Sequence, residues 1–378
     1  MRVLFIIQGE GRGHLTQALS LRQILAQAGH QVAGVLVGTA EGREIPGFFT
    51  SQISVPLEPF QSPNLIYEAH KGSINLSKTI TTHLLRAGRY TASLRTINAA
   101  VQRVKPDLIV NFYEVLGGLY TMLYRPGVPM ACVAHQYLFL HPQFPFPKNS
   151  WLDRQLVNLN TRLTALGAAQ KLALSFRRFS QESFGSLTIV PPLLRQEVKH
   201  LTPTTGDYAL VYLTHHSLSR KVTAWHHQHP EMLLHCFWDK ADAPEELKVD
   251  DTLTFHRING AKFLRMMESC RALVTTAGFE SVCEAMYLGK PVLMVPVPKH
   301  FEQACNAIDG VLSGAGASSR VFDLSVLTDF LPYFQSPRVE FQSWCSESDR
   351  LFIRHLETVV SNHQKTGYAP SQGELTFG

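Results

Sequence analysis

Residues 274–307 constrain the fold more than any other stretch of the chain. An apolar run at 272–274 ends in small and hydroxylated residues, and a helical pattern of apolar residues follows it. Gly289, with a proline two positions later, predicts that this helix ends at Leu288. A second apolar run, residues 292–295, comes next. The order strand, loop, helix, strand is typical of a parallel sheet.

Polar residues gather at the start of this predicted helix. Gly278 allows a ligand to approach the backbone, and the N–H groups of the first turn attract an anion or a sugar. Glu280 and Glu284 are four residues apart, so both carboxylates lie on one helical face. A carboxylate accepts two hydroxyl hydrogen bonds at once, which suits the vicinal diol of a ribose or a hexose. The alternative is that Glu280 only favours the helix dipole and Glu284 is merely solvated.

A second polar cluster follows the run at 292–295, in a loop and the start of another helix. Its members are Lys299, His300, Glu302, Gln303 and Asn306. Two such clusters after neighbouring strands favour a binding site over isolated solvated residues.

The two clusters together resemble a known motif. The sequence G-F-E-S-V-C-E-A-M-Y-L-G-K-P-V-L-M-V-P-V, followed by H-F-E-Q-x-x-N-A, resembles the donor-sugar motif of family 28 glycosyltransferases. That family has the GT-B fold and includes the peptidoglycan N-acetylglucosaminyltransferase and plant galactolipid synthases. The resemblance implies that Glu284 holds the ribose of a UDP-sugar and that Glu302 and Gln303 hold sugar hydroxyls. The usual pair there is Gln-Gln or Asp-Gln, so Glu302 leaves the sugar open.

The N-terminal segment reads as strand, glycine loop, helix. Gly9, Gly11 and Gly13 form G-x-G-x-G, with His14 where a dinucleotide fingerprint requires its last glycine. The broken fingerprint counts against an NAD-dependent oxidoreductase, which only this loop suggests. The resembling family has a glycine-rich loop ending in G-H here, which implies that Gly11, Gly13 and His14 face the acceptor and the diphosphate. A helix-capping or partly buried histidine is the alternative for His14.

Further site residues follow predicted strands. The expected donor-binding residues are Gly11, Gly13, Thr214, His215, Ile258, Gly278, Phe279, Glu280, Ser281, Glu284, His300, Glu302 and Gln303. A strand at 108–110 delivers Glu114 to the carboxyl end of the sheet, where ligands bind, and His135 is expected at the same edge.

Two residues are candidates for the catalytic base. His14 needs no pKa shift, because free histidine titrates near pH 6.5. Glu114 would need its pKa raised by burial.

Length and composition set the domain organisation. At 378 residues the chain is long for one core, and 45% hydrophobic with 17% charged residues fits a globular protein. Length thus favours two domains, and the resemblance implies an α/β protein of two Rossmann-like domains facing across a cleft, the GT-B architecture. Residues 1–192 form the acceptor-side domain and 193–345 the nucleotide-sugar-binding domain. Residues 346–378 form a helix returning to the first domain, and a tail.

Charge and cysteine usage limit partners and location. A net charge of +5 is too weak over this length to indicate nucleic acid, although it suits an anionic membrane surface or a phosphorylated substrate. The six cysteines include no C-x-x-C pair, and no apolar stretch is long enough for a signal peptide or a membrane span. We expect a cytoplasmic protein and leave contact with the inner face of a membrane open.

Several local patterns allow more than one interpretation. Residues 53–57 predict a strand, and residues 79–104 predict a helix whose basic face is either solvated or placed on anionic lipid. The aromatic and proline-rich stretch at 137–147 is either a covered loop or a docking surface. His226, His227 and His229 suggest zinc, but no spacing of cysteine or glutamate completes a site.

The sequence therefore predicts a glycosyltransferase that moves a sugar from a UDP-sugar to an acceptor hydroxyl without a metal or other cofactor. No D-x-D motif holds a metal, so helix N-termini and basic or hydroxyl groups must meet the diphosphate charge. A nucleotide-sugar epimerase and a non-catalytic carbohydrate-binding protein are the alternatives. The acceptor, lipid-linked or saccharide, the sugar and the anomeric outcome stay open.

Overall fold

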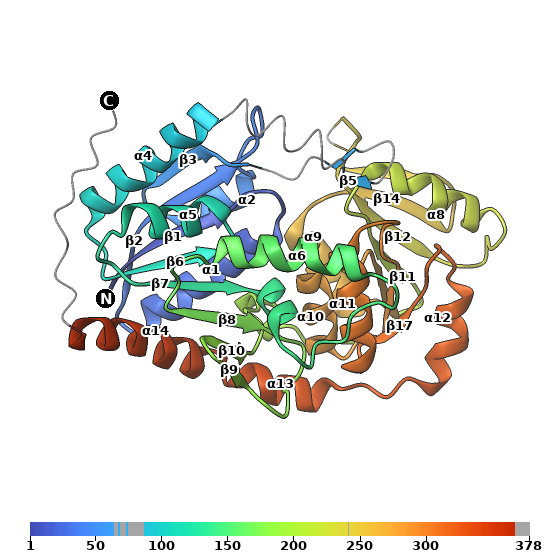
Figure 1. Cartoon of the computed structure of the whole chain (residues 1–378). Helices are drawn as coiled ribbons and strands as arrows, with labels where there is room; N and C mark the ends of the chain where they lie inside the picture. The colour runs from blue at the N-terminus through green and yellow to red at the C-terminus, as the bar shows by residue number, and fades with distance from the viewer. Residues whose placement is uncertain (64–66, 69–72, 75–86, 241, 367–378) are drawn as a thin grey trace. The chain divides into compact units, whose positions relative to one another are not determined.

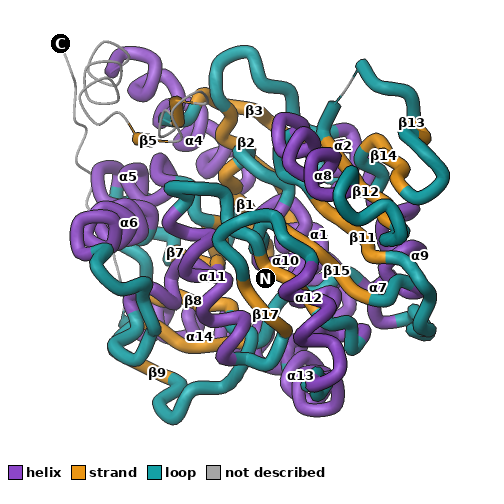
Figure 2. Tube along the Cα trace, turned by 90° about the vertical axis from the view of Figure 1, so that its right-hand side faces the viewer, coloured by secondary structure: helices purple, strands orange, loops and turns teal. Residues whose placement is uncertain are grey.

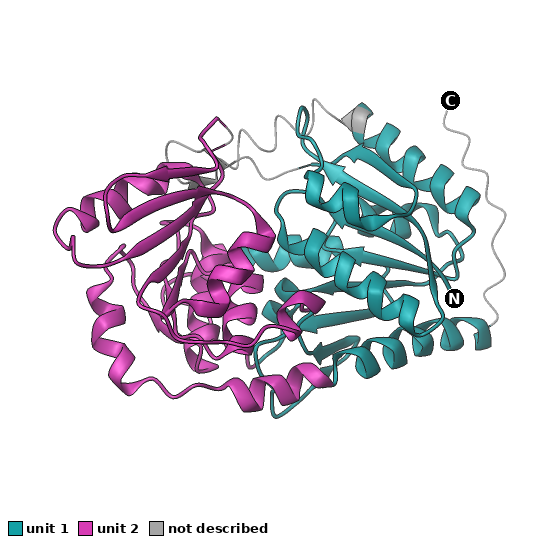
Figure 3. Ribbon diagram, turned by 180° about the vertical axis from the view of Figure 1, so that it is seen from behind, with its two compact units in different colours: residues 1–142, 155–193, 347–378 teal, residues 143–154, 194–346 magenta. Residues whose placement is uncertain are grey.

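The computed structural model describes residues 1–63, 67–68, 73–74, 87–240 and 242–366 (Figure 1). The chain divides into two compact units (Figure 3). The first holds Met1–Pro142, Gln155–Leu193 and Glu347–Gly378, and the second holds Gln143–Arg154 and Leu194–Ser346. The expected domain boundary at 192/193 falls beside the break at Leu193, whereas Gln143–Arg154, expected in the first domain, groups with the second unit.

The first unit is built on an eight-stranded sheet in the order β3-β2-β1-β6-β7-β8-β10-β9. Its strands are β1 (Arg2–Gln8), β2 (Gln31–Thr39), β3 (Leu57–Gln61), β6 (Leu108–Phe112), β7 (Met130–Ala134), β8 (Gln170–Leu174), β9 (Ser183–Phe184) and β10 (Leu187–Val190). Only β9, which pairs with β10, is antiparallel. The strands β6 and β7 are buried at every position, as in a parallel sheet covered on both faces. A separate antiparallel pair joins β4 (Tyr67–Glu68) and β5 (Ser73–Ile74).

Helices pack their apolar faces against this sheet. They are α1 (Gly13–Gln27), α2 (Gly47–Ile53), α4 (Ala87–Val104), α5 (Val115–Tyr124), the 3-10 helix η1 (His135–Leu140), α6 (Trp151–Thr164) and α14 (Ser348–Lys365). The helix α1 packs on β1 and β2, and α4 packs on β2 and β3. The C-terminal helix α14 contacts α1, β7 and β10 (Figure 1). None of the described helices is long and apolar enough to cross a membrane.

The second unit is built on a seven-stranded sheet in the order β13-β14-β12-β11-β15-β16-β17. Its strands are β11 (Ala209–Tyr212), β12 (Leu234–Trp238), β13 (Glu246–Lys248), β14 (Leu253–Arg257), β15 (Ala272–Thr275), β16 (Val292–Met294) and β17 (Gly316–Ser318). All pairs are parallel except β13 with β14. The neighbours β12, β11 and β15 can be followed in Figure 2. With two parallel-type sheets and flanking helices, the expected α/β class is confirmed.

The helices of the second unit connect these strands. They are α7 (Gln196–Lys199), η2 (His216–Leu218), α8 (Ser219–His226), α9 (Gly260–Ser269), α10 (Phe279–Leu288), α11 (Phe301–Leu312), α12 (Ser325–Phe330), η3 (Leu331–Tyr333) and α13 (Arg338–Ser346). The helix α10 ends as expected, because Gly289 adopts φ 73°, a left-handed conformation suited to glycine.

One local prediction needs correction. The strand predicted at 53–57 is wrong: the helix α2 ends at Ile53, and β3 begins at Leu57. Phe49 and Ile53 are four residues apart and both buried, so the apolar pattern there has helical rather than strand spacing. The C-terminal helix expected within residues 346–378 is α14, which begins at Ser348, and a separate helix, α13, ends just before it at Ser346.

The structure also bears on the two patterns that the sequence left open, the basic helix at 79–104 and the aromatic stretch at 137–147. Of the helix predicted at 79–104, residues 79–86 lie outside the described part. On the remainder, Arg95 and Arg103 are exposed and Arg103 pairs with Glu58, which is compatible with both interpretations of this face. The aromatic stretch is covered: Tyr137 and Phe139 are buried on the 3-10 helix η1, and Phe144 is buried in the loop that follows.

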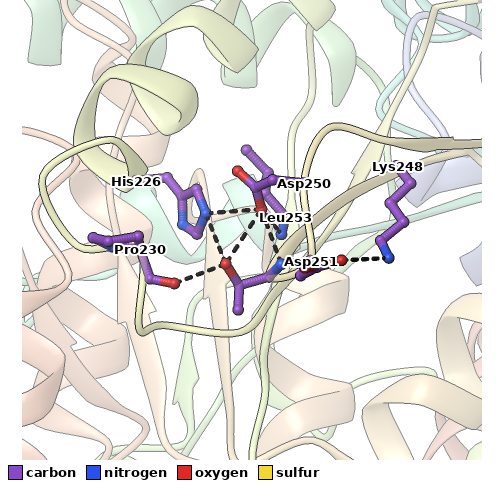
Figure 4. A network of polar contacts seen from close by, with 7 residues as sticks. His226, Pro230, Lys248, Asp250, Asp251 and Leu253 are labelled. Carbon is purple, nitrogen blue, oxygen red and sulfur yellow. Dashed lines mark hydrogen bonds and ion pairs between the residues drawn. The ribbon is translucent and has the colours of Figure 1, made fainter.

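The three histidines near α8 have structural surroundings. His226 is buried, and its Nε2 lies 3.3 Å from Asp250 Oδ1 and 3.2 Å from Thr252 Oγ1 (Figure 4). The backbone N–H groups of Thr252 and Leu253 donate to the same carboxylate oxygen, and these hydrogen bonds lower the pKa of Asp250. His227, by contrast, is exposed. His226 and His227 therefore have different environments, and His226 stabilises the turn before β14.

A buried histidine pair on β12 and β14 predicts a pH-dependent stability. His256 is 2% exposed, with Lys262 Nζ 3.0 Å from its Nδ1 and His235 Nδ1 3.0 Å from its Nε2. Burial, then Lys262 and His235, lower the pKa of His256 to about 4. Because the unfolded imidazole titrates near 6.5, stability is complete above that pH and falls as pH drops toward 4. His256 should therefore contribute a loss of roughly 1–3 kcal/mol in the free energy of unfolding between pH 7.5 and 5, measured by urea unfolding as the difference between the natural protein and His256→Asn.

The control for this prediction is the exposed His227. In His256→Asn, the contribution of His256 to the pH dependence of the free energy of unfolding should be absent. His227→Asn should show the same pH dependence as the natural protein. Equal pH dependence in all three proteins would contradict the assignment.

Candidate active site

In the first unit, the predicted residues meet at the carboxyl edge of the sheet. The ends of β1, β2 and β6 are in register, with Gln8 opposite Gly38 and Ile7 opposite Phe112. Loops leaving these strands therefore start side by side. Gly9 donates its N–H to Gly38 O at 2.7 Å, and a Cβ at Gly9 would clash with that carbonyl. The glycine is needed for this close approach, which directs the chain through Gly11 into α1.

His14 lies in the first turn of α1, half-buried at this edge. Its Nδ1 is 3.2 Å from Gln17 Oε1, and its Nε2 is 3.5 Å from the amide nitrogen of Gln136. The imidazole stacks on Tyr113, with ring centroids 5.7 Å apart and 25° between the planes. The position before α1 is Arg12, which makes no side-chain cap, so His14 is partly buried rather than a helix cap.

Tyr113 is held in a strained conformation directly behind His14. Its φ is 59°, in the left-handed region, and its side chain is buried. The hydroxyl lies 2.8 Å from Thr161 Oγ1 and accepts from Asn160 Nδ2 at 3.2 Å. Such strain is concentrated at functional sites. Sequence reasoning assigned Tyr113 no role, and its only signal was its place between a strand and the following helix.

Glu114 is fully buried and caps α5. Its Oε1 accepts from Ser62 Oγ at 2.7 Å and from the N–H of Leu116 at 3.0 Å. Its Oε2 is buried without a hydrogen-bond partner among the described residues, and a Cβ at Gly38 would collide with it. Burial raises the pKa of Glu114 to about 7. This pKa suits a catalytic base, but the buried carboxyl group is not accessible to a substrate.

His135, expected at the same edge, is turned inward. It is 2% exposed, and its Nδ1 lies 2.8 Å from the carbonyl of Leu174. His135 therefore lies at the expected edge, directly after β7, but a carbonyl at the end of β8 holds its imidazole buried inside the unit.

In the second unit, the clusters meet after β11, β15 and β16. Tyr212 is opposite Thr275, and Thr275 is opposite Met294, so the loops that follow share one edge. Thr276 Oγ1 donates to Thr214 Oγ1 at 3.3 Å. Ala277 has φ 61°, a second left-handed residue at a strand end.

A shallow pocket opens at this edge. Its lining includes Thr276 and Pro296 from the strand ends and two cations, Lys221 and Arg320. Both cations are exposed. Neither was predicted, since an exposed basic residue on a helix such as α8 or in a loop carries no sequence signal of its own.

Glu284 is buried on α10 rather than solvated, at 3% exposure. Both Nε and Nη2 of Arg195 lie 2.6 Å from its Oε1. Burial raises the pKa of Glu284, and the ion pair with Arg195 opposes that rise. Glu280, one turn earlier, is half-buried, and both Phe279 and Ser281 are buried. Gly278 occupies the N-cap position, so the first-turn N–H groups of α10 open onto the loop edge.

The second polar cluster, between Lys299 and Asn306, connects the loops to one another through hydrogen bonds. His300 caps α11 by accepting from Gln303 N at 3.4 Å. Gln303 Oε1 accepts from Val297 N at 2.8 Å, and Asn306 Nδ2 donates to Ala277 O at 3.0 Å. Glu302 is half-buried beside them. Because the carbonyl oxygen of Gln303 is engaged, its amide nitrogen is the group suited to donate to a sugar hydroxyl.

Two expected donor residues have other engagements. The backbone N–H of Ile258 donates to Trp238 O at 3.1 Å, so only the carbonyl oxygen of Ile258 can hydrogen-bond the nucleobase of a donor. The ring of His215 accepts from Ser217 N at 3.1 Å.

One group of possible metal ligands occurs among the described residues: His215, His216 and Asp239, all exposed. Their ligand atoms lie within 4.8 Å of one another. The two rings stack on each other, with centroids 4.3 Å apart and 28° between the planes. His216 also uses its backbone N–H and Nδ1 on Asp239 Oδ1. Exposed groups of this kind are common without an ion, so the cluster by itself assigns no metal.

Comparison with known proteins supplies the context of this geometry. Residues 1–334 match the family model described as glycosyl transferase family 1. The calicheamicin glycosyltransferase CalG4 is 16% identical, with TM-score 0.61 over 98% of this chain and 100% of that chain. Phytolacca americana UGT2, complexed with UDP-2fluoro-glucose and pterostilbene, is 14% identical, with TM-score 0.63 over 96% of this chain and 99% of that chain. Spinosyn rhamnosyltransferase SpnG, complexed with thymidine diphosphate, is 14% identical, with TM-score 0.59 over 94% and 100%. These likenesses confirm the expected GT-B fold.

Proposed function

The chain belongs to glycosyl transferase family 1, and we propose that this glycosyltransferase moves a sugar from a UDP-sugar to an acceptor hydroxyl without a metal ion. The observation that carries the proposal is the polar edge after β11, β15 and β16. There, α10 follows β15 and carries a buried carboxylate, and two cations line a pocket with the ends of β11, β15 and β16. Ligands of open parallel sheets bind at that end.

Each part of a nucleoside diphosphate sugar has a matching group at this edge. Glu284 accepts from the ribose hydroxyls, and Glu302 with Gln303 holds the transferred sugar. Thr276, the first-turn N–H groups of α10, Lys221 and Arg320 meet the charge of the diphosphate. These groups take the place of a metal, in keeping with the missing D-x-D motif.

The reaction then needs only a base. As the acceptor oxygen forms its bond to the anomeric carbon, the bond from that carbon to the diphosphate breaks and UDP leaves. His14 Nε2 accepts the proton of the acceptor hydroxyl. Its half-buried position supports this role over Glu114, which is fully buried.

Uridine is preferred because of the motif that ends in Glu284. UGT2 is complexed with a UDP-sugar analogue and SpnG with thymidine diphosphate, so pyrimidine nucleotides are the relevant set to compare. The test is UDP release from UDP-glucose, with diacylglycerol or N-acetylglucosamine as acceptor. A transferase releases UDP faster when an acceptor is present. An epimerase would convert the sugar with neither acceptor nor release.

The two pocket cations lead to a prediction on donor affinity. Lys221→Ala and Arg320→Ala should each raise the donor KM by roughly 3–30-fold, because each removes a charged hydrogen-bond donor from the diphosphate. Turnover at saturating donor should change less than KM, and steady-state kinetics with varied UDP-sugar separates the two constants. Arg271, exposed before the amino end of β15, is the matched control, and Arg271→Ala should behave as the natural protein. Equal KM values for all the proteins would remove both cations from the site.

A further inference from the structure

We propose that Gln17 and Gln136 together fix one tautomer of His14, with the proton on Nδ1 and the lone pair on Nε2. Gln17 is then a positioning residue for the base. The catalytic part of this inference rests on the proposed function, whereas the tautomer itself does not.

The first contact is on α1 itself. His14 and Gln17 are three residues apart and so share a face of the helix. Gln17 is 3% exposed, and its Oε1 lies 3.2 Å from Nδ1 of the imidazole. An amide oxygen only accepts, so the ring nitrogen that faces it carries the proton.

The second contact comes from a different part of the unit. Gln136 lies on η1, is 7% exposed, and brings its amide nitrogen to 3.5 Å from Nε2. An amide nitrogen only donates, so this ring nitrogen carries the lone pair. The two amides approach from separate elements and require the same tautomer. The opposite tautomer would require both amides to rotate.

The plane of the ring is set separately. The imidazole stacks on Tyr113, whose own hydroxyl is tied to Thr161 and Asn160. The stack fixes the plane of the imidazole, and the two amides fix the orientation of the ring within that plane. The long 3.5 Å approach of Gln136 is also weaker than an ordinary hydrogen bond, so an acceptor hydroxyl can replace it at Nε2.

The choice of an amide over a carboxylate at Nδ1 has a chemical consequence. A carboxylate there would favour the charged imidazolium, which cannot act as a base. A neutral amide orients the ring without adding charge. Gln17→Glu should therefore move the rising limb of the kcat/KM pH profile to higher pH, by about 1 unit.

The deciding experiment is nitrogen-15 NMR of the full chain labelled at histidine, with His14→Ala used to assign the ring signals. We expect His14 to show a protonated Nδ1 and an unprotonated Nε2 above its titration. Gln17→Leu should show both tautomers and lose roughly 10–100-fold in kcat with little change in donor KM, since only part of the base contribution is lost. Gln23→Leu, an exposed glutamine on the same helix, is the control for both measurements.

The outcomes separate the two claims. A protonated Nε2 in the natural protein would overturn the tautomer assignment, as would ring signals in Gln17→Leu that match the natural protein. If Gln17→Leu does not fold, the ring signals of the natural protein alone decide. If the tautomer is as stated but His14→Ala keeps full activity, the tautomer stands and His14 is not the base.

Discussion

Replacing His14 with alanine is expected to lower turnover by about 10²–10⁴-fold, the usual contribution of a general base. Donor binding should stay nearly unchanged, because His14 lies in the first unit and the proposed donor groups lie on the second. Steady-state turnover and the calorimetric affinity for UDP measure the two effects separately.

Glu114→Gln is the matched comparison for this prediction. Glu114 is 0% exposed and its Oε1 already accepts from Ser62 and from the N–H of Leu116, so we expect its amide variant to keep most of the turnover. If Glu114→Gln abolishes activity and His14→Ala does not, the roles are reversed and His14 is only a contact to the diphosphate or the acceptor.

Replacing Glu284 with alanine is expected to weaken UDP binding by roughly 10–100-fold, because one or two charged hydrogen bonds to the ribose are lost. Stability should fall as well. The change leaves Arg195 facing a buried position without its carboxylate, and breaking a buried pair on one side costs about 3–5 kcal/mol, less here because Arg195 is partly exposed. Urea unfolding and calorimetry with UDP measure the two losses.

A double variant separates binding from folding. Glu284→Ala with Arg195→Ala removes both charges, so it should recover part of the lost stability without recovering UDP affinity. UDP affinity equal to that of the natural protein in a folded Glu284→Ala variant would remove the carboxylate from the ribose site.

The strand, loop, helix, strand unit around α10 was predictable almost residue by residue. Gly289 and the proline after it are local signals, and the structure ends α10 at Leu288 as the sequence indicates. The strand predicted at 53–57 failed because a seven-residue helix, α2, carries only two buried apolar residues, Phe49 and Ile53. So short a pattern does not separate helical from extended spacing.

The sequence predicted which residues gather at the candidate site, but it did not predict which side chains they contact. Glu284 looked like a solvent-edge carboxylate whose removal would cost little stability, since its partner Arg195 is 89 positions away. Gln17 looked like an ordinary polar residue of α1, because its role depends on the side chain of His14. The left-handed backbone of Tyr113 has no sequence signal at all.

The same limit applies to the family. The motif ending in Glu284 resembles family 28, whereas the match over residues 1–334 is to the model described as glycosyl transferase family 1. The shared GT-B fold is confirmed. The narrower likeness to family 28, and with it the choice of uridine, stays a prediction.

Thermal unfolding with a panel of nucleotides tests the central claim most directly. A ligand that binds only the folded protein stabilises it by about 2.7 kcal/mol at 100 times its Kd. We predict that UDP and UDP-sugars raise the Tm of the natural protein more than thymidine diphosphate does, that GDP and ADP leave it unchanged, and that Glu284→Gln loses most of the shift. Equal shifts with every nucleotide, no shift with any of them, or a full UDP shift in Glu284→Gln would contradict a uridine nucleotide site at α10.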